Sequence, residues 1–527
     1  MTTASVSSAA TVPGAAPDRL NAGAWLLDRR VAAGDGERVA VRCRGRDHTY
    51  AELTLLSASV AAALRHSGVR PEERVLLVMV DGPELVAALC GAMRMGAVPV
   101  PLSTMSTPAD LAFLAADSRA RLAVVSGQFV EAGRAMATGG PELADLVVAG
   151  GDPGPPLAAA RLHRWDDWLA DAGGGDGSVL DTRPDSPAFW LYTSGTTGKP
   201  KGAMHRHADL PFTAETYASQ VLGIRRDDRC FSIAKLFFAY GLGNSLSFPL
   251  SAGACAVLEP GPPTPASVAA LVTAERPTLF FATPTFYAGL LAADLPEDTF
   301  ASVRQAVSAG EGLPAPVFER FRDRFGVEIL DGLGSTEATH IFLSNRPGAV
   351  VPGSSGTPVP GYDVRLVDDA GLPVEGGGPG HLMVRGESLA TGYWCRTEVT
   401  RRVFCGEWVR TGDMYVRDDA GVYRHCGRSD DMLKVGGIWV SPAEVEATLI
   451  AHEQVVEAAV VAEVDGDGIQ RPVAYVVARP GSAVEPEELI EFCRARLAAF
   501  KRPRRVVLCE QLPKTATGKI QRFKLRG

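Results

Sequence analysis

The chain has 527 residues, a formal net charge of −8 and nine cysteines. This length exceeds what one compact core usually reaches and predicts two or more domains. The acidic balance argues against nucleic acid as the main partner. The cysteines form neither a CxxC pair nor a Cys/His cluster, which indicates no disulfide framework and no structural zinc site.

The first 18 residues are dominated by Ala, Ser, Thr, Pro and Gly, without a basic start or an apolar centre. This composition is typical of a flexible tail and not of a signal peptide. A membrane-spanning helix needs roughly 18 uninterrupted apolar residues, and the best candidate, at 85–102, is interrupted by Arg94 and two prolines. We therefore expect a cytoplasmic protein.

From residue 39 onward, short apolar runs alternate with segments of helical periodicity. Apolar runs without alternation, interleaved with helices, predict a parallel sheet that is covered on both faces. A hairpin at 44–46 comes first, and residues 150–187, rich in Gly, Pro and Asp, are interpreted as a connection between subdomains. The predicted helices lie at 52–65, 84–94 and 109–116, and the predicted strands at 75–80, 98–102 and 122–126.

A stretch rich in glycine and hydroxyl side chains, YTSGTTGKPKG at 192–202, follows an apolar run at 188–191 that predicts a buried strand. Backbone N–H groups, hydroxyls and lysines on such a loop are suited to binding phosphate. The spacing of a Walker loop is absent, and Lys199 is followed by Pro200. Apolar residues recur at helical spacing after Asp209, the candidate N-cap, so we expect a strand, a phosphate loop and then a helix.

The rest of the chain falls into three parts. More strands and helices alternate up to about residue 350, a β-rich subdomain with two Asp-Asp-Ala-Gly turns follows, and an α+β unit begins after the polar break at 427–431. The predicted strands lie at 230–234, 254–258, 278–282, 305–309, 328–330, 364–367, 381–385, 421–426, 455–463 and 473–478, and the last two helices at 443–450 and 487–500.

These patterns predict an α/β fold with a large N-terminal domain at 19–429 and a smaller α+β C-terminal domain at 431–527. The large domain would contain two doubly wound α/β subdomains and the small β-rich subdomain.

Further motifs follow the glycine-rich loop. DGLGSTE at 331–337 ends a predicted strand, where a carboxylate is well placed to hold Mg²⁺ against ATP phosphates. The carboxylate of TGD at 411–413 can accept hydrogen bonds from both ribose hydroxyls. Taken singly, these motifs fit a helix cap or a turn. Three more complete the set: GRSD at 427–430, KVGG at 434–437 and PKTATGK at 513–519.

In this order and spacing, the six motifs closely resemble those of the adenylate-forming superfamily of acyl-CoA synthetases, luciferases and carrier-loading adenylation domains. The resemblance covers essentially the whole chain after the tail, and it implies ATP, Mg²⁺ and coenzyme A as cofactors. It also implies that the glycine-rich loop holds the β- and γ-phosphates. The residues of that loop are Thr193, Ser194, Gly195, Thr196, Thr197 and Lys199.

The resemblance implies roles for residues beyond this loop, with a C-terminal domain that swings between two half-reactions. One departure is Leu333, where many relatives carry an aromatic residue near adenine. The matching positions are Asp331, Thr336 and Glu337 for phosphate and Mg²⁺, Asp413 and Arg428 for ribose, Asp430 for the hinge, Gly436 and Gly437 for the pantetheine tunnel, and Lys519 for the catalytic lysine.

The acid is indicated by AKLFFAYGLGN at 234–244 and ATHIF at 338–342, which resemble the benzoate-CoA ligase branch. Aromatic and branched walls grip a flat ring, and a glycine leaves a slot for it. Taken alone, the same aromatic residues would be core residues before a helix. The resemblance implies benzoate, with substituted benzoates and heteroaryl acids left open, and a ring surrounded by Phe238, Ala239, Tyr240, Gly334, His340 and Ile341.

Other functions fit parts of the same pattern. The aryl group could pass to the phosphopantetheine of a carrier protein, with basic residues at 501–505 facing an acidic carrier helix, the phosphates of CoA or water. A non-catalytic nucleotide-binding relative would not require the intact Glu337, Asp413, Arg428 and Lys519. A luciferase-type oxidase shares the motif spacing, and the sequence leaves monomer and homodimer open.

Overall fold

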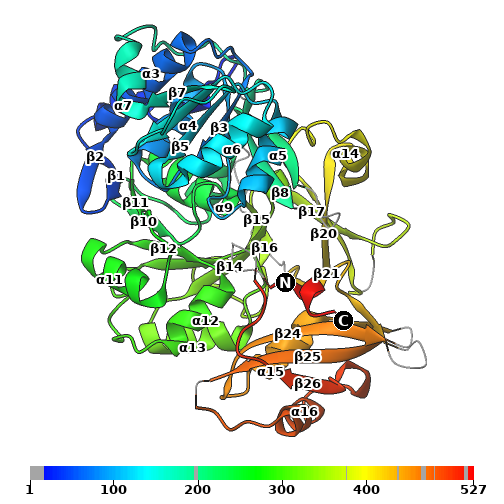
Figure 1. The fold of residues 1–527 in the computed structure, drawn as a ribbon. Coiled ribbons are helices and arrows are strands. Elements are labelled where there is room, and N and C mark those ends of the chain that lie inside the picture. The colour runs from blue at the N-terminus through cyan, green and yellow to red at the C-terminus, as the bar shows by residue number, and fades with distance from the viewer. Residues whose placement is uncertain are drawn as a thin grey trace, which may run out of the picture.

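The computed structural model describes residues 17–194, 200–374, 377–435, 438–464, 470–479, 481–514 and 520–526. A large α/β unit, blue to yellow in Figure 1, is followed by a smaller α+β unit, orange to red. The predicted fold class is therefore confirmed. None of the described helices is long and apolar enough to cross a membrane.

The first sheet is entirely parallel, in the order β4-β3-β5-β6-β7, as the uninterrupted apolar runs predict. A capping box of Thr49 and Glu52 starts its first helix. The strands are β3 (Arg74–Val78), β4 (Val98–Pro101), β5 (Leu122–Ser126), β6 (Asp145–Ala149) and β7 (Arg161–Arg164), and the helices α3 (Tyr50–His66), α4 (Pro83–Arg94), α5 (Pro108–Ser118) and α6 (Val130–Gly139).

The interpretation of residues 150–187 as a plain connection is wrong. They contain the edge strand β7 and the helix α7 (Trp165–Asp171). The strand escapes a search for apolar runs because its sequence is Arg-Leu-His-Arg. Two of its side chains contact the fully buried Asp145 on β6: Arg161 Nε lies 2.8 Å from Asp145 Oδ1 in an ion pair, and His163 Nε2 lies at the same distance.

The second sheet has nine strands, in the order β16-β15-β14-β13-β12-β10-β11-β1-β2. The predicted hairpin of β1 and β2 joins this sheet, because β1 pairs in parallel with β11. Its strands are β1 (Val39–Cys43), β2 (Arg46–Thr49), β10 (Arg229–Ser232), β11 (Cys255–Leu258), β12 (Leu279–Ala282), β13 (Gln305–Ser308), β14 (Ile329–Gly334), β15 (Ile341–Ser344) and β16 (Thr357–Pro358), and helices α11 (Pro265–Glu275), α12 (Pro284–Ala292) and α13 (Ala315–Phe325) lie between them in the chain.

The glycine-rich loop connects two strands and not a strand and a helix. Strand β8 (Pro187–Ser194) pairs antiparallel with β9 (Pro200–Arg206). The sequence patterns did not predict β9, because this strand mixes charged and apolar residues. Helix α8 (Asp209–Thr213) starts one residue earlier than expected, with Ala208 and not Asp209 at its N-cap. The Asp209 carboxylate points backward instead, to His205 Nδ1 at 2.9 Å and the Arg206 N–H at 3.1 Å.

The β-rich subdomain is an antiparallel sheet in the order β17-β18-β20-β19, with β21 paired to β20. It forms the right-hand side of the large unit in Figure 1. Its elements are β17 (Asp363–Val367), β18 (Gly380–Arg385), α14 (Thr397–Val403), β19 (Phe404–Cys405), β20 (Trp408–Arg417) and β21 (Tyr423–Arg428).

The C-terminal unit is built on the sheet β24-β25-β26. The helix predicted at 487–500 ends six residues early, because the chain turns after Arg494 and forms a short 3-10 turn at Ala499–Lys501. The elements are β22 (Leu433–Val435), β23 (Ile438–Val440), α15 (Pro442–Ile450), β24 (Val455–Val464), β25 (Gln470–Ala478), α16 (Pro486–Arg494) and β26 (Arg505–Leu508).

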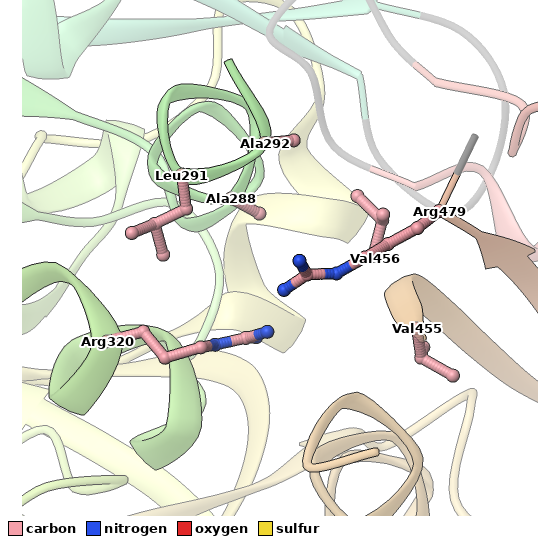
Figure 2. A pocket seen from close by; sticks show the side chains of 7 residues that line it. All are labelled: Ala288, Leu291, Ala292, Arg320, Val455, Val456 and Arg479. Carbon is pink, nitrogen blue, oxygen red and sulfur yellow. The ribbon is translucent and has the colours of Figure 1, made fainter. Parts of the chain in front are cut away.

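The two units meet where α12 and α13 face α15 and β24, in one shared hydrophobic cluster. A small pocket opens in this contact (Figure 2). Two guanidinium groups point into it, and burial together with the charge of Arg479 lowers the pKa of Arg320. Like charges thus lie together at this contact. The pocket is lined by Ala288, Leu291, Ala292, Arg320, Val455, Val456 and Arg479.

Candidate active site

The base of the phosphate loop is a strand hairpin. Thr193 is half-buried at the end of β8 and pairs with Lys201 on β9. Ser194 is described only as the last backbone position of β8. Several predicted site residues lie outside the described residues, and their roles stay predictions: Gly195, Thr196, Thr197, Lys199, Gly436, Gly437 and Lys519.

Glu337 lies on a short 3-10 turn after β14 and faces the phosphate-loop hairpin. Its Oε1 accepts a hydrogen bond from the Tyr393 hydroxyl at 2.6 Å, and its backbone carbonyl accepts the Ala390 N–H at 2.7 Å. Lys201 Nζ lies 4.4 Å from the centre of the Tyr393 ring. Burial lowers the pKa of Lys201, and the negative charge of Glu337 opposes this shift. Carboxylate, tyrosine and lysine therefore form one polar group beside the loop.

The donor set at Glu337 fits Mg²⁺. This cation usually takes one or two carboxylates and fills its other positions with phosphate oxygens and water. Among the described residues, no group of three or more His, Cys, Asp or Glu could hold a metal by itself. Thr336, the neighbour of Glu337, is fixed through its backbone carbonyl, which accepts His205 Nε2 at 2.9 Å.

Asp331 has a different environment from Glu337. It is buried, and it is paired in register with Ser308 on the neighbouring strand β13. Burial raises the pKa of Asp331 well above its usual range. Burial therefore disfavours the charged form of Asp331, whereas Mg²⁺ binds ionised carboxylates, so Glu337 is the better-placed of the two.

Asp413 and Arg428, the predicted ribose contacts, face each other across β20 and β21. Arg428 Nη1 lies 3.1 Å from Asp413 Oδ1, and His425 Nε2 lies 3.7 Å from the same oxygen. Burial alone would raise the pKa of Asp413, but the charge of Arg428 and the bonds from His425 and Arg428 lower it to about 2. The carboxylate is therefore ionised and ready to accept hydroxyl hydrogen bonds. Gly412 permits this contact, because it has a φ of +81° and a Cβ there would lie 2.6 Å from Arg428 Nη2.

Asp430, the predicted hinge, lies two residues beyond Arg428. Its backbone carbonyl accepts a hydrogen bond from Arg526 Nη2 at 3.1 Å, near the C-terminus. Arg526 also forms an ion pair with Asp431.

His340 is the centre of the predicted acid pocket. It is fully enclosed by aromatic rings, with ring centres 5.5 Å away at Tyr217, 5.5 Å at Tyr240 and 4.4 Å at Phe248. Its Nε2 lies 3.0 Å from Asn244 Oδ1. Burial lowers the pKa of His340 to about 3, so the imidazole is neutral. A neutral ring among aromatic walls suits an uncharged aryl group.

Glycines make room for this arrangement. A Cβ on Gly243 would lie 2.2 Å from His340 Cδ2, and a Cβ on Gly334 would lie 2.5 Å from the His340 carbonyl oxygen. Gly334 also pairs in register with the buried Ile341. The structure therefore brings four predicted pocket residues together: Tyr240, Gly334, His340 and Ile341.

The other two predicted pocket residues start a short helix. Phe238 is the N-cap of α9 (Ala239–Leu242), and Ala239 is the first residue of that helix. Both are half-buried, and the Phe238 ring packs against Phe237 at 4.5 Å between centres.

Asp81 and Lys235, which the sequence did not single out, hold the segment before α9 in place. Asp81 Oδ1 accepts the Leu236 N–H at 3.1 Å, and Lys235 Nζ donates to the Gly261 carbonyl at 2.7 Å. Burial raises the pKa of Asp81 to about 6, against the opposing charge of Lys235. Asp81 belongs to the first sheet's unit, so no local pattern could have connected it with residue 236.

The buried state of His340 predicts a pH effect. Its pKa of about 3 lies below the ordinary value of 6.5, so the unfolded chain binds the extra proton between these values and stability falls as the pH falls through that window. By pH 5 the loss is about 2 kcal/mol. Because His340→Asn removes this loss, its cost in unfolding free energy should be about 2 kcal/mol smaller at pH 5 than at pH 7.5, as measured by urea unfolding.

His207 provides an independent check on the direction of this pH dependence. Burial lowers its pKa to about 4, and its Nδ1 accepts the Ala22 N–H at 2.9 Å, outside the pocket. The loss of unfolding free energy caused by His207→Asn should likewise be smaller at pH 5 than at pH 7.5. A cost of His340→Asn that is equal at both pH values would contradict a neutral, buried imidazole.

Comparison with known protein families identifies the family of the chain. A family described as AMP-binding enzyme matches residues 28–394, and a second, described as AMP-binding enzyme C-terminal domain, matches residues 444–519. The chain belongs to the adenylate-forming AMP-binding enzymes. The resemblance seen in the six motifs is thereby confirmed, and the predicted ATP, Mg²⁺ and coenzyme A are the cofactors of this family.

Similar members of the family can be named. The chain is 46% identical to the benzoate–CoA ligase of Thauera aromatica, over 97% of this chain and 96% of that protein. It is 43% identical to the 4-hydroxybenzoate–CoA/benzoate–CoA ligase of Rhodopseudomonas palustris, over 96% and 94%. The crystal structure of the anthranilate CoA ligase AuaEII in complex with anthranoyl-AMP has a TM-score of 0.91, with 40% identity over 97% of both chains.

Proposed function

We propose that this adenylate-forming enzyme is a benzoate–CoA ligase. The observation that carries the proposal is the buried, uncharged cluster in which His340, Tyr240 and Gly334 meet, close in the chain to Glu337, which faces the phosphate-loop hairpin. Relatives that carry an aryl acid in their names span nearly the whole chain at 43–46% identity.

The reaction would proceed in two steps. A carboxylate oxygen of benzoate forms a bond to the α-phosphorus of ATP, and the bond from that phosphorus to the bridging oxygen of pyrophosphate breaks. In the second step, the sulfur of coenzyme A forms a bond to the acyl carbon, AMP leaves with the carboxyl oxygen, and the thiol proton is released. Cations at the α-phosphate stabilise the charge that accumulates there.

The chain's own residues divide these tasks. Glu337 would hold Mg²⁺, Asp413 would accept the ribose hydroxyls, and Arg428 would keep Asp413 ionised. Bound Mg²⁺ would neutralise phosphate charge. Lys519 would act in the first step, and Gly436 with Gly437 would line the path of the pantetheine.

We also propose the domain division suggested by the sequence, with a unit at 19–429, a unit at 431–527 and the hinge at Asp430. The change of architecture at this point, from the β20–β21 sheet to the separate β24-β25-β26 sheet, supports it. We propose a cytoplasmic location as well, in keeping with cysteines that are all free.

The proposal predicts the order of acids in an ATP–pyrophosphate exchange assay. Benzoate should give a higher kcat/KM than acetate or hexanoate, because an aliphatic chain leaves the aromatic walls unfilled. Substituted benzoates should fall within about 1–3 kcal/mol of benzoate, the usual discrimination of such walls. If acetate or hexanoate outperformed benzoate, the pocket assignment would be wrong. If none of the acids, benzoate included, supported exchange, a non-catalytic relative would be favoured.

Free coenzyme A is better supported than a carrier protein as the acceptor of the benzoyl group. The basic run at 501–505 is largely paired within the chain: Lys501 Nζ lies 2.7 Å from Glu444 Oε1, Arg505 pairs with Glu463, and Arg502 Nε donates to the Leu497 carbonyl. Little of this charge is left for an acidic carrier helix or for the phosphates of coenzyme A, so the preference for free coenzyme A rests on the relatives, which are named as CoA ligases. Benzoyl transfer to free coenzyme A should therefore exceed transfer to a holo-carrier under equal conditions.

A further inference from the structure

Tyr393, which the six motifs do not include, joins the phosphate-loop hairpin to the carboxylate at Glu337. Tyr393 forms an isolated antiparallel β-bridge with Ala203 on β9. On either side, the Trp394 N–H donates to the Gly202 carbonyl at 2.9 Å, and the Met204 N–H donates to the Gly392 carbonyl at 3.0 Å. The segment around Tyr393 is therefore hydrogen-bonded along β9, at the base of the phosphate loop.

The tyrosine side chain is held from several directions. Its backbone N–H donates to Thr400 Oγ1 at 3.0 Å, and its ring packs edge-on against Phe404 with centres 5.3 Å apart. Gly392 has a φ of +146°, and a Cβ there would lie 2.9 Å from Thr400 Cγ2, so only glycine fits this turn. Tyr393 is 4% exposed. The hydroxyl is thus placed by a rigid, buried frame.

The hydroxyl contacts one oxygen of Glu337 and leaves the other available. Tyr393 OH donates to Oε1 at 2.6 Å. Among the residues that the structure describes, no hydrogen-bond donor to Oε2 is found. The Lys201 ammonium covers the Tyr393 ring at 4.4 Å. A carboxylate that is held through one oxygen presents the other in a fixed direction, which is how partners of metal ligands commonly raise metal affinity.

We propose that Tyr393 is the positioning residue for Glu337, and that binding of the metal–ATP complex depends on its hydroxyl. This inference rests on the proposed function only in the assignment of Glu337 to the metal. Tyr393 touches neither the acid nor the nucleotide in this role, and it acts through the carboxylate.

The test compares Tyr393→Phe with the wild type, since phenylalanine keeps the ring contacts with Phe404 and Lys201 and removes only the hydroxyl. Mn²⁺ serves as the probe: binding of Mn·ATP to the enzyme is titrated by electron paramagnetic resonance without any acid present. Tyr393→Phe should weaken Mn·ATP binding about 10- to 100-fold, the usual effect of losing such a partner. In steady state the apparent Mg²⁺ requirement should rise while the KM for benzoate stays unchanged.

Tyr423→Phe is the matched control, because it loses a buried hydroxyl in the same β subdomain, bonded at 3.1 Å to the Val364 carbonyl. It should bind Mn·ATP as the wild type does. Binding by Tyr393→Phe within twofold of the wild type, or an equal loss in both variants, would overturn the inference. If the wild type binds Mn·ATP but forms no aryl-adenylate, the proposed function fails and the role of Tyr393 is still decided by the titration.

Discussion

Lys519→Ala should lower aryl-adenylate formation about 10²- to 10³-fold, the usual cost of removing one preorganised charge at a developing anion. It should leave thioester formation from supplied benzoyl-AMP largely intact, because the α-phosphate has already reacted in that step. Pyrophosphate release from ATP and benzoate measures the first half-reaction, and benzoyl-CoA formation from benzoyl-AMP measures the second.

The residues on either side of the segment at 515–519 support this expectation. Lys514 pairs with Ile520 in an isolated β-bridge, and the Ile520 N–H donates to Glu311 Oε1 at 3.0 Å. Glu311 follows β13, at the same edge of the second sheet from which Glu337 and the acid pocket project. The C-terminal unit therefore delivers the ends of this segment to the edge of the sheet where adenylation would occur.

Lys514→Ala is the control for general effects of losing a lysine here. Lys514 Nζ lies 2.6 Å from Glu457 Oε1, within the C-terminal unit, and it should contribute little to the first half-reaction. An equal fall of both half-reactions in Lys519→Ala would assign the lysine a different role. If Lys519→Ala carried out the first half-reaction at the wild-type rate, Lys519 would have no catalytic role in it.

Local sequence patterns predicted most strands and helices, because each depends on periodicity over a few residues. They failed where polar residues hid a strand, as at β7, where an arginine and a histidine contact a buried carboxylate on the neighbouring strand β6. They also failed at β9, because a hairpin that mixes charged and apolar residues lacks the signal of a buried parallel strand.

In the site, too, local motifs identified some residues and missed those that depend on distant partners. The motifs singled out Glu337, Asp413 and Arg428 as candidates, because the family resemblance assigns metal and ribose contacts to these positions. Tyr393 and Asn244 escaped because each acts through a partner distant in the chain: Tyr393 through Glu337 and Asn244 through His340. A Gly-Tyr-Trp sequence at 392–394 is present, but nothing local connects it with residue 337. Only the pairing of this segment with β9 reveals the connection.

Gly243→Ala should impair binding of the acid by displacing the His340 ring. The new Cβ would lie 2.2 Å from His340 Cδ2 and 3.1 Å from Phe248 Cζ, so the imidazole must leave its place and lose its 3.0 Å hydrogen bond to Asn244. Losing a buried hydrogen bond costs about 1–3 kcal/mol. We therefore expect kcat/KM for benzoate to fall roughly 5- to 150-fold while the KM for ATP stays unchanged.

Two further variants separate this steric effect from other causes. Gly289→Ala on α12 places its Cβ 3.6 Å from Pro265 Cγ, an ordinary contact, and should behave as the wild type. Asn244→Ala removes the partner of His340 without adding any atom, and it should reproduce the loss for benzoate in the same direction. If Gly243→Ala used benzoate as well as the wild type, His340 would not set the shape of the pocket. The acid would then have to be recognised by the half-buried residues at the start of α9, because they are the remaining predicted walls that do not depend on the position of this ring.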